Sequence, residues 1–482
     1  MTYAIVFSIC LHVSSEELSQ PQFSSQSEHQ VAVDVTNGPA VFRPIHYLGS
    51  KLRIAPAIAA ALDDADVSRG PVLDLFAGSG TTAFALAKHR PVIASDIQEY
   101  SRVICSALLS SRPRGADIVS IFAERWKEGS PLRDALFDAI EPLIQYERDA
   151  LLAARDGETE AICSVLEHGS ILAAERGLTG SASSELQRHV VEVTRRLAAA
   201  GLSGSAVATA VRYFGGAYFS YAQAVELDCL ASIVTESMPS ELADIFTAAL
   251  LSTASDTVNT VGKQFAQPIR PRTKQGAVKH HLLKKIDRDR HLDVRSIYSG
   301  WLERYAGHGV PEKGHVAVRA DFREALRRYA GQYSVVYADP PYTRDHYSRF
   351  YHVLETMALR DNPTIARSPG SSADELSRGL YREDRHQSPF CIRSQAEGAF
   401  RELFDLSSKG GANVVLSYSP FESGAHPRLM QIGALLALAS EFYPSVELES
   451  VDGFSHSKLN HSSLNFETPP EAEVLIVCRL KR

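Results

Sequence analysis

The residue types best suited to chemistry stand at positions 339–342, where the sequence reads Asp339-Pro340-Pro341-Tyr342. The apolar run 334–338 before them predicts a buried strand, so they would lie at a strand's carboxyl end, where open α/β sheets bind ligands. Two prolines fix the turn and donate no hydrogen bond, which leaves the Pro340 carbonyl and the Asp339 carboxylate as neighbouring acceptors. An amino group could bind both, and the Tyr342 ring could stack on a nucleobase. The alternative is a simple strand-to-helix turn.

A glycine-containing loop far upstream forms a second group of candidates. Residues 71–76 predict a short buried strand, and residues 83–88 predict the start of a helix. Between them, Gly78 and Gly80 allow a sharp turn and the close approach of a ligand to the backbone. An ordinary α/β turn is the alternative, because many such proteins turn on glycine after the first strand.

The next predicted strand, 91–96, ends in Asp96, which lies 22 residues beyond Asp74. That spacing suits a carboxylate that binds ribose hydroxyls in a βαβ nucleotide site, although Asp96 could also be a helix cap. The loop lacks the third glycine of the dinucleotide fingerprint and the Gly-Lys-Ser/Thr ending of a triphosphate loop. A nucleoside without a phosphate chain therefore fits the pattern better.

Together the two segments resemble the amino-methyltransferases that use S-adenosylmethionine, and most closely the Dam-like group of DNA adenine N6-methyltransferases. That group has a Tyr-x-Gly-x-Lys segment before its glycine loop, and this sequence has Tyr47-Leu48-Gly49-Ser50-Lys51 there. The run 74–81 resembles the cofactor loop, and 414–419 resembles a later strand that frames the target-base pocket. Asp321 and Phe322 look like the pair that contacts the cofactor's adenine, although Asp321 also reads as an ordinary helix N-cap.

The resemblance implies an α/β fold of the Rossmann-like methyltransferase type, with a mostly parallel sheet and helices on both faces. It also implies S-adenosylmethionine as cofactor. The cofactor-binding residues that it implies are Tyr47, Gly49, Lys51, Asp74, Phe76, Gly78, Gly80, Asp96, Asp321 and Phe322. Lys51 would lie near the cofactor's carboxylate, where a point charge is useful; a solvated lysine is the alternative.

The implied reaction is methylation of adenine N6 in double-stranded DNA, with Asp339, Pro340, Pro341 and Tyr342 as the catalytic residues. The lone pair of the amino nitrogen is delocalised into the adenine ring. Hydrogen bonds from the amino group to Asp339 and the Pro340 carbonyl would localise that pair on the nitrogen. The base would have to be flipped out of the duplex, and neither a metal nor a covalent intermediate is needed. Alternatives are an RNA base amino-methyltransferase and a non-catalytic nucleic-acid-binding protein that retains the fold.

The resemblance divides the sequence into three parts. Residues 1–40 are predicted to be an N-terminal tail, and residues 41–110 and 315–482 the catalytic domain. The intervening 111–314 would be an inserted domain that recognises DNA. Its first part has helical spacing, as in 184–197. The run 213–221 interrupts it with five aromatic residues and two glycines, which fits core packing or a contact with DNA.

The second part of the insertion carries a basic strip, residues 263–290, with nine Lys or Arg and two acids. Because the whole chain has a net charge of −7, a locally basic strip predicts contact with DNA phosphates. A solvated loop without a partner is the alternative. The predicted DNA-binding residues are Lys263, Arg270, Arg272, Lys274, Lys279, Lys284, Lys285 and Arg288.

Composition sets the remaining expectations. Hydrophobic residues make up 44% and charged residues 22% of the chain, which is typical of a soluble globular protein. The six cysteines form no C-x-x-C pair, so they predict neither a zinc site nor a disulfide framework. The apolar start lacks a cationic region and is too short to span a bilayer. We therefore expect a cytoplasmic protein without a membrane partner. The resemblance implies a setting in restriction-modification or phage defence, with a cognate restriction or defence protein as a further partner; a solitary methylase is the alternative.

Overall fold

Seven strands of the described residues form one sheet, in the order β3-β2-β1-β4-β5-β7-β6. The computed structural model describes residues 42–110, 117–127, 130–178, 182–308, 314–341, 347–368, 376–419, 429–451 and 473–481. The strands are β1 (Val72–Asp74), β2 (Val92–Asp96), β3 (Val316–Arg319), β4 (Val335–Ala338), β5 (Asn413–Tyr418), β6 (Ser445–Ser450) and β7 (Val474–Arg479). Neighbouring strands from β3 to β5 are parallel, whereas β7 runs antiparallel to both β5 and β6.

The central strands are short apolar runs because helices cover the sheet on both faces. Along β4, Val335 and Tyr337 point to one face, and Val336 and Ala338 to the other. The first face is covered by α1 (Ala55–Ala65), α2 (Thr81–Leu86) and α3 (Glu99–Leu109). The second is covered by α14 (Phe322–Arg328), α16 (Ala396–Lys409) and α17 (Ile432–Ser440). This mixed α/β architecture agrees with the predicted fold class, and the strands expected at 71–76, 91–96, 334–338 and 414–419 are confirmed to within two residues at each end.

The inserted segment is helical, as predicted. Its helices are α4 (Ile118–Lys127), α5 (Pro131–Arg155), α6 (Glu160–His168), α7 (Ile171–Glu175), α8 (Ser184–Ala199), α9 (Thr209–Phe214), α10 (Tyr221–Ser237), α11 (Ala243–Thr257), α12 (Leu283–Arg290) and α13 (Val294–Gly307). Short 3₁₀ turns occur at η1 (Lys51–Arg53), η2 (Ala206–Ala208), η3 (Val261–Lys263), η4 (His280–Leu282) and η5 (Pro389–Cys391).

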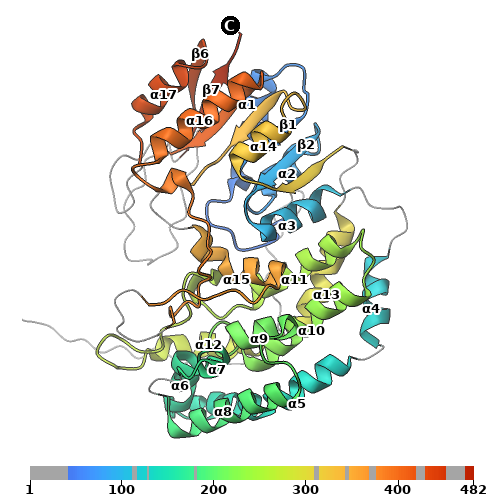
Figure 1. Ribbon diagram of the computed structural model, residues 1–482, viewed down its shortest axis with the longest axis vertical. Coiled ribbons are helices and arrows are strands. Elements are labelled where there is room, and N and C mark those ends of the chain that lie inside the picture. Colours follow the sequence, from blue (N-terminus) through green and yellow to red (C-terminus); the bar gives the residue numbers. More distant parts are fainter. Residues whose placement is uncertain are drawn as a thin grey trace, which may run out of the picture. The chain divides into compact units, whose positions relative to one another are not determined.

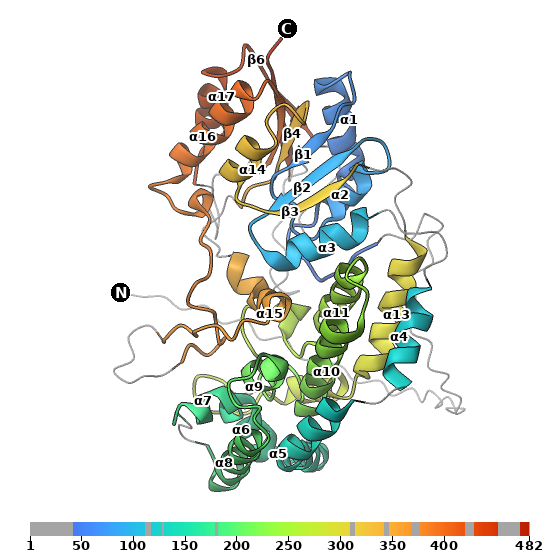
Figure 2. The same ribbon diagram turned by 45° about the vertical axis from the view of Figure 1, so that its right-hand side comes forward.

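Helix α8 shows why these sequences are helical. The Ser183 hydroxyl accepts a hydrogen bond from the Leu186 N–H and so caps the first turn. Leu186, Val190, Val193 and Leu197 then form one buried stripe at the spacing of an amphipathic helix. The stripe packs α8 against α5, and both helices lie at the end of the insertion farthest from the sheet (Figures 1 and 2).

The aromatic run 213–221 belongs to the core. Tyr213, Phe214, Tyr218, Phe219 and Tyr221 are at most 2% exposed, so their side chains cannot reach DNA. The core alternative is therefore the right one, because the glycines let this segment fold back between α9 and α10.

Helix α15 (Tyr347–Leu359) follows the predicted catalytic turn and lies between the sheet and the inserted helices (Figures 1 and 2). It packs against α3 on one side and α11 on the other. Phe42–Arg482 forms one compact unit, so the catalytic and inserted parts are not separated there, and their division into domains stays a prediction. The predicted tail lies outside the described residues. In the part of the chain that is described, no helix combines the length and apolar character that crossing a membrane requires.

Candidate active site and nucleic-acid surface

The sheet changes direction between β1 and β4. From β1 the chain moves outward through β2 to β3, and β4 then starts the other half of the sheet. Ligands of open α/β sheets bind at such a switch point, outside the carboxyl ends of the strands. Asp74 ends β1, Asp96 ends β2 and Asp339 follows β4, so the structure brings these three predicted residues to one edge.

The glycine loop after β1 is held against the end of β2. Gly78 has φ +51° and Gly80 has φ +71°, which are conformations that favour glycine. The N–H groups of Gly78 and Gln98 donate to the two Asp96 carboxylate oxygens, each at 2.9 Å. A Cβ at Gly78 would overlap the Tyr47 hydroxyl. Asp96 therefore shapes the loop directly, whatever ligand it also binds.

Asp74 is a buried carboxylate without a strong partner. Its side chain is 0% exposed, and neither of its oxygens makes a hydrogen bond of normal geometry among the described residues. Burial, followed by the charge of Asp339, raises the pKa of Asp74 to about 8, and the Phe76 N–H only partly opposes this rise. Because a buried charge without a partner is costly, the site favours a cationic group beside this carboxylate.

Lys51 is the buried cation of the site. Its Nζ lies 3.1 Å from Asp339 Oδ1 and 3.3 Å from Glu473 Oε1, and the lysine side chain is 8% exposed. The structure therefore places Lys51 against the predicted catalytic carboxylate, and its contact with a cofactor stays a prediction. The Ser417 hydroxyl donates to Glu473 Oε1 at 2.6 Å. The polar contacts therefore run from Asp339 through Lys51 and Glu473 to Ser417.

Glu473 has no predicted role, and Ser417 is predicted only as part of the strand 414–419 that frames the target-base pocket. Glu473 directly precedes β7, and Ser417 lies in β5. Because β7 runs antiparallel to β5, its amino end lies at the same edge as the carboxyl ends of the parallel strands. An acidic residue just before a late apolar strand would predict a residue of this site only if the direction of that strand in the sheet were known.

Helix α15 is joined to the predicted cofactor segments by direct contacts. Tyr47 stacks on Tyr351 with ring centres 4.8 Å apart, and the Leu48 N–H donates to the Tyr351 hydroxyl at 2.7 Å. Glu355 accepts from the N–H groups of Glu99 and Tyr100 at the start of α3, at 3.1 and 3.0 Å. These contacts fix the helix that follows Asp339, Pro340 and Pro341. Tyr342 lies outside the described residues, so its stacking role stays a prediction.

Three phenylalanines form an aromatic wall beside the glycine loop. Phe76, Phe322 and Phe390 contact one another with ring centres 5.1 to 6.2 Å apart. Asp321 caps α14 by accepting from the Glu324 N–H at 2.8 Å, as one of the two interpretations expected. The predicted contact of Asp321 with the cofactor's adenine remains untested. Gly49 has φ +74° and is exposed next to the start of α15.

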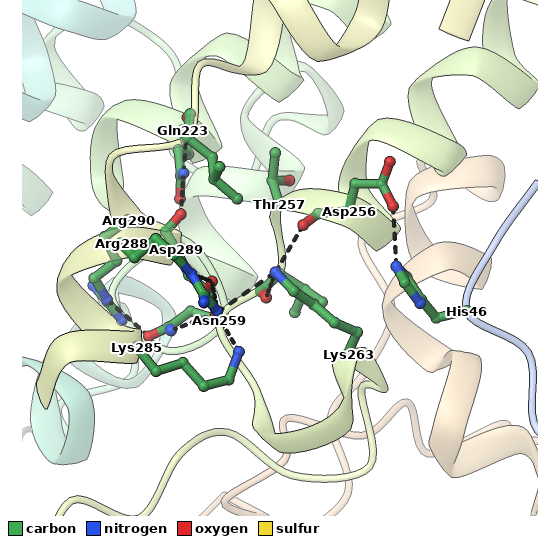
Figure 3. A network of polar contacts seen from close by, with 12 residues as sticks. His46, Gln223, Asp256, Thr257, Asn259, Lys263, Lys285, Arg288, Asp289 and Arg290 are labelled. Carbon is green, nitrogen blue, oxygen red and sulfur yellow. Dashed lines mark hydrogen bonds and ion pairs between the residues drawn. The ribbon is translucent and has the colours of Figure 1, made fainter. Parts of the chain in front are cut away.

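Three cations of the basic strip gather around one carboxylate of the protein. Lys263, Lys285 and Arg288 all contact the buried carboxylate of Asp289 (Figure 3). Lys263 Nζ also donates to the carbonyls of Asp256 and Val258 at 2.7 and 3.0 Å, at the end of α11. These contacts hold η3 and α12 onto the inserted helices.

The remaining cations of the strip differ in their surroundings. Arg272 pairs with Glu160 and Glu167 at 2.7 and 3.2 Å, and Lys279 Nζ donates to the Arg270 carbonyl at 3.1 Å. Arg270, Lys274 and Lys284 are exposed and form no ion pair with any described residue. Whether any of the eight cations binds DNA is not tested by these contacts, and the assignment stays a prediction.

Comparisons with known proteins support the resemblance. The model of the D12 class N6 adenine-specific DNA methyltransferases matches residues 47–140 and 314–374. Modification methylase LlaI of Lactococcus lactis subsp. lactis is 31% identical over 144 residues, which is 30% of this chain and 20% of the relative. The chain thus spans about a fifth of the length of the curated relative that it matches. No solved structure matches the chain. The family match confirms the predicted resemblance to DNA adenine N6-methyltransferases, and the relative is by its name a modification methylase.

Proposed function

We propose that this chain transfers a methyl group from S-adenosylmethionine to the N6 amino group of adenine in double-stranded DNA. The observation that carries the proposal is the position of Asp339 and Pro340 at the switch point of the sheet, beside Asp74 and the glycine loop. The fold is then of the Rossmann-like methyltransferase type, and the inserted helices with the basic strip are the DNA-recognition domain.

The residues around the glycine loop fit the proposed cofactor. S-adenosylmethionine carries an ammonium and a sulfonium charge, and the buried Asp74 carboxyl makes no hydrogen bond of normal geometry within the described part of the chain. The Asp96 carboxylate at the end of β2 suits ribose hydroxyls. The aromatic wall of Phe76, Phe322 and Phe390 suits a purine ring. When bound, the cofactor supplies a methyl group on a positively charged sulfur.

Asp339 and Pro340 would act on the target amino group. Hydrogen bonds to the Asp339 carboxylate and the Pro340 carbonyl favour a pyramidal nitrogen whose lone pair is no longer delocalised into the ring. Lys51 holds the Asp339 carboxylate through Oδ1 and is itself held by Glu473. A fixed carboxylate is needed because methyl transfer requires the nitrogen in line with the reacting carbon. Tyr342 would stack on the flipped base.

The setting of this reaction belongs to the same proposal. A modification methylase among the relatives favours a role in restriction-modification, with a restriction or defence protein as partner. Modification of cellular DNA would place the enzyme in the cytoplasm.

The experiment is expression of the chain in a host that lacks its own adenine methylation, followed by sequencing that detects modified bases. N6-methyladenine at one recurring sequence is the expected result, absent from cells that express Asp339→Ala at the same level. The same assay gives the recognition sequence. Methylated RNA with unmodified DNA would instead support the RNA alternative, and no modified base in either would refute the proposal.

A further inference from the structure

A second group of cations lies beside α15 and differs from the group around Asp289. It consists of Arg270, Arg349, Arg378 and Arg385, and is called the arginine cluster below. Its members come from three segments that meet at Tyr381: the basic strip, α15, and the chain between residues 376 and 385. The Cζ atoms of Arg349 and Arg385 lie 5.4 and 4.7 Å from the centre of the Tyr381 ring.

The three segments are fixed to one another by hydrogen bonds. The Phe265 N–H donates to the Phe350 carbonyl at 3.1 Å, which joins the start of the strip to α15. Arg378 Nη2 donates to the Ile269 carbonyl at 2.7 Å, and the Tyr381 hydroxyl donates to the Ala266 carbonyl. The arginines are therefore gathered by the fold.

No member of the arginine cluster forms an ion pair with a carboxylate of the described residues. Their neighbour Arg382 shows the contrast, since it is 4% exposed and pairs with Asp361 and Asp384 at 2.7 and 2.9 Å. Glu167 acts on Arg378 from beyond ion-pair distance and is itself paired with Arg272.

The cations of the cluster also repel one another. Burial, and then the charge of Arg349, lowers the pKa of Arg385, while burial and the charge of Arg270 lower the pKa of Arg378. Guanidinium groups remain charged at neutral pH in spite of such shifts. Four like charges without a carboxylate partner cost free energy, and a bound anion would remove that cost.

The cluster lies next to the candidate active site. Arg349 is exposed in the first turn of α15, and Tyr347 of the same turn approaches Gly49, where a Cβ would lie 3.8 Å from the tyrosine hydroxyl. Arg270 is also exposed. An anion held by these two arginines would thus lie near the place where the target base enters.

We propose that the arginine cluster binds backbone phosphates of double-stranded DNA beside the target adenine. This inference rests on the proposed function and deepens it by naming the surface that holds the substrate. Guanidinium groups suit phosphate because two N–H groups can bind two oxygens at once. Lys263 and Lys285 would contribute less, because both are largely buried and are held by the Asp289 carboxylate.

The test removes Arg270 and Arg349, the two exposed members that make no side-chain hydrogen bond in the described part of the chain. The double variant Arg270→Ser/Arg349→Ser is compared with Arg148→Ser/Arg188→Ser, which removes two exposed arginines from α5 and α8 at the far end of the insertion. The affinity for one fixed DNA duplex is measured as a function of salt concentration, and kcat and KM are measured as well where the wild-type chain methylates that duplex.

We expect the slope of log binding constant against log salt concentration to become less steep by about two in the double variant, since each phosphate contact contributes about 0.9 to that slope. KM for DNA should rise ~10-fold or more, while kcat at saturating DNA changes little. Arg349→Lys should keep most of the slope, because the charge remains. An unchanged slope in the double variant, or an equal loss in the control variant, would overturn the proposal.

Other outcomes separate this proposal from the proposed function. A wild-type chain that binds DNA with a cluster-dependent slope but transfers no methyl group would support the phosphate surface and refute the proposed function. A chain that methylates duplex DNA without any dependence on the arginine cluster would support the proposed function and refute the phosphate surface. A loss of affinity confined to RNA would overturn the choice of DNA as the partner.

Discussion

Two regions of this molecule bury ionisable side chains, and the surroundings of these side chains differ. In the inserted helices, Arg290 is 4% exposed and contacts Glu147, Asn259 and the Gly216 carbonyl, so its charge has several partners. At the carboxyl edge of the sheet, Asp74 is fully buried and has neither an ion pair nor a hydrogen bond of normal geometry with any residue that the structure describes.

Buried ionisable groups that have partners serve the fold, whereas those without partners are kept for a ligand. A paired buried charge is hard to remove without loss of stability, whereas a buried charge without a partner costs stability and persists where it is used. The same distinction applies among the cations. The group around Asp289 has a carboxylate at its centre (Figure 3), whereas the arginine cluster around Tyr381 has none among the described residues.

The largest stability effect is expected at the Arg290 pair. Arg290→Met leaves Glu147 buried without its cation, and we expect a loss of ~3–5 kcal/mol in the free energy of unfolding, measured with denaturant. The double variant Arg290→Met/Glu147→Leu should recover part of this loss, because both charges are then gone. A loss below ~1 kcal/mol in the single variant would show that the pair is not needed for folding, and would break the comparison.

A smaller effect, on cofactor affinity, is expected at Asp96. Asp96→Ala removes the acceptor of the Gly78 and Gln98 N–H groups and the proposed ribose ligand. We expect the dissociation constant for S-adenosylmethionine to rise ~10- to 100-fold by calorimetry, since hydrogen bonds to a charged group contribute ~1.5–3 kcal/mol.

Asp293→Ala is the matched control for this variant. Asp293 caps α13 by accepting from the Ser296 N–H at 2.6 Å, away from the glycine loop. It should lose some stability but bind S-adenosylmethionine normally. Equal binding by the Asp96 and Asp293 variants would refute the cofactor role of Asp96.

The smallest effect is a pH dependence set by Asp74. Its pKa is about 8 in the free protein, so the carboxyl is protonated below that pH and must lose its proton before it can pair with a cation. Affinity for S-adenosylmethionine should therefore fall as pH is lowered below about 8, by up to ~10-fold per pH unit.

Asp74→Asn removes the titrating group and should flatten this profile. The comparison between the two profiles also cancels any titration of the cofactor itself. If the wild-type chain and Asp74→Asn show the same dependence on pH, Asp74 does not face the cofactor's charge.

The sequence predicts the carboxyl edge better than it predicts the charge pattern of the insertion. Asp74, Asp96 and Asp339 each end or follow an apolar run, and parallel strands bring such ends together, so local patterns place them. The position of Glu473 is not predicted in this way, because β7 is antiparallel and the direction of a strand depends on the whole sheet.

Counting charges in the basic strip does not show which of them face solvent. Lys285 and Arg288 stand one turn apart on α12 and look alike in the sequence, yet the Lys285 side chain is 25% exposed and that of Arg288 68%, and both contact a buried aspartate. Arg349 stands outside the strip and has no basic neighbour in its helix, so its place beside Tyr381 follows only from tertiary contacts. A local pattern predicts a residue's face on an element, but its partners depend on distant segments.

The central claim is that Asp339 accepts a hydrogen bond from the target amino group during methyl transfer. The direct measurement is single-turnover methylation of a duplex by the wild-type chain and by Asp339→Ala, with both bound to saturating DNA and S-adenosylmethionine. We expect the rate for Asp339→Ala to be lower by at least ~10²-fold while DNA and S-adenosylmethionine still bind, because the loss of a positioned catalytic group typically has an effect of this size. A rate for Asp339→Ala close to that of the wild-type chain would contradict the catalytic assignment and the proposed function with it.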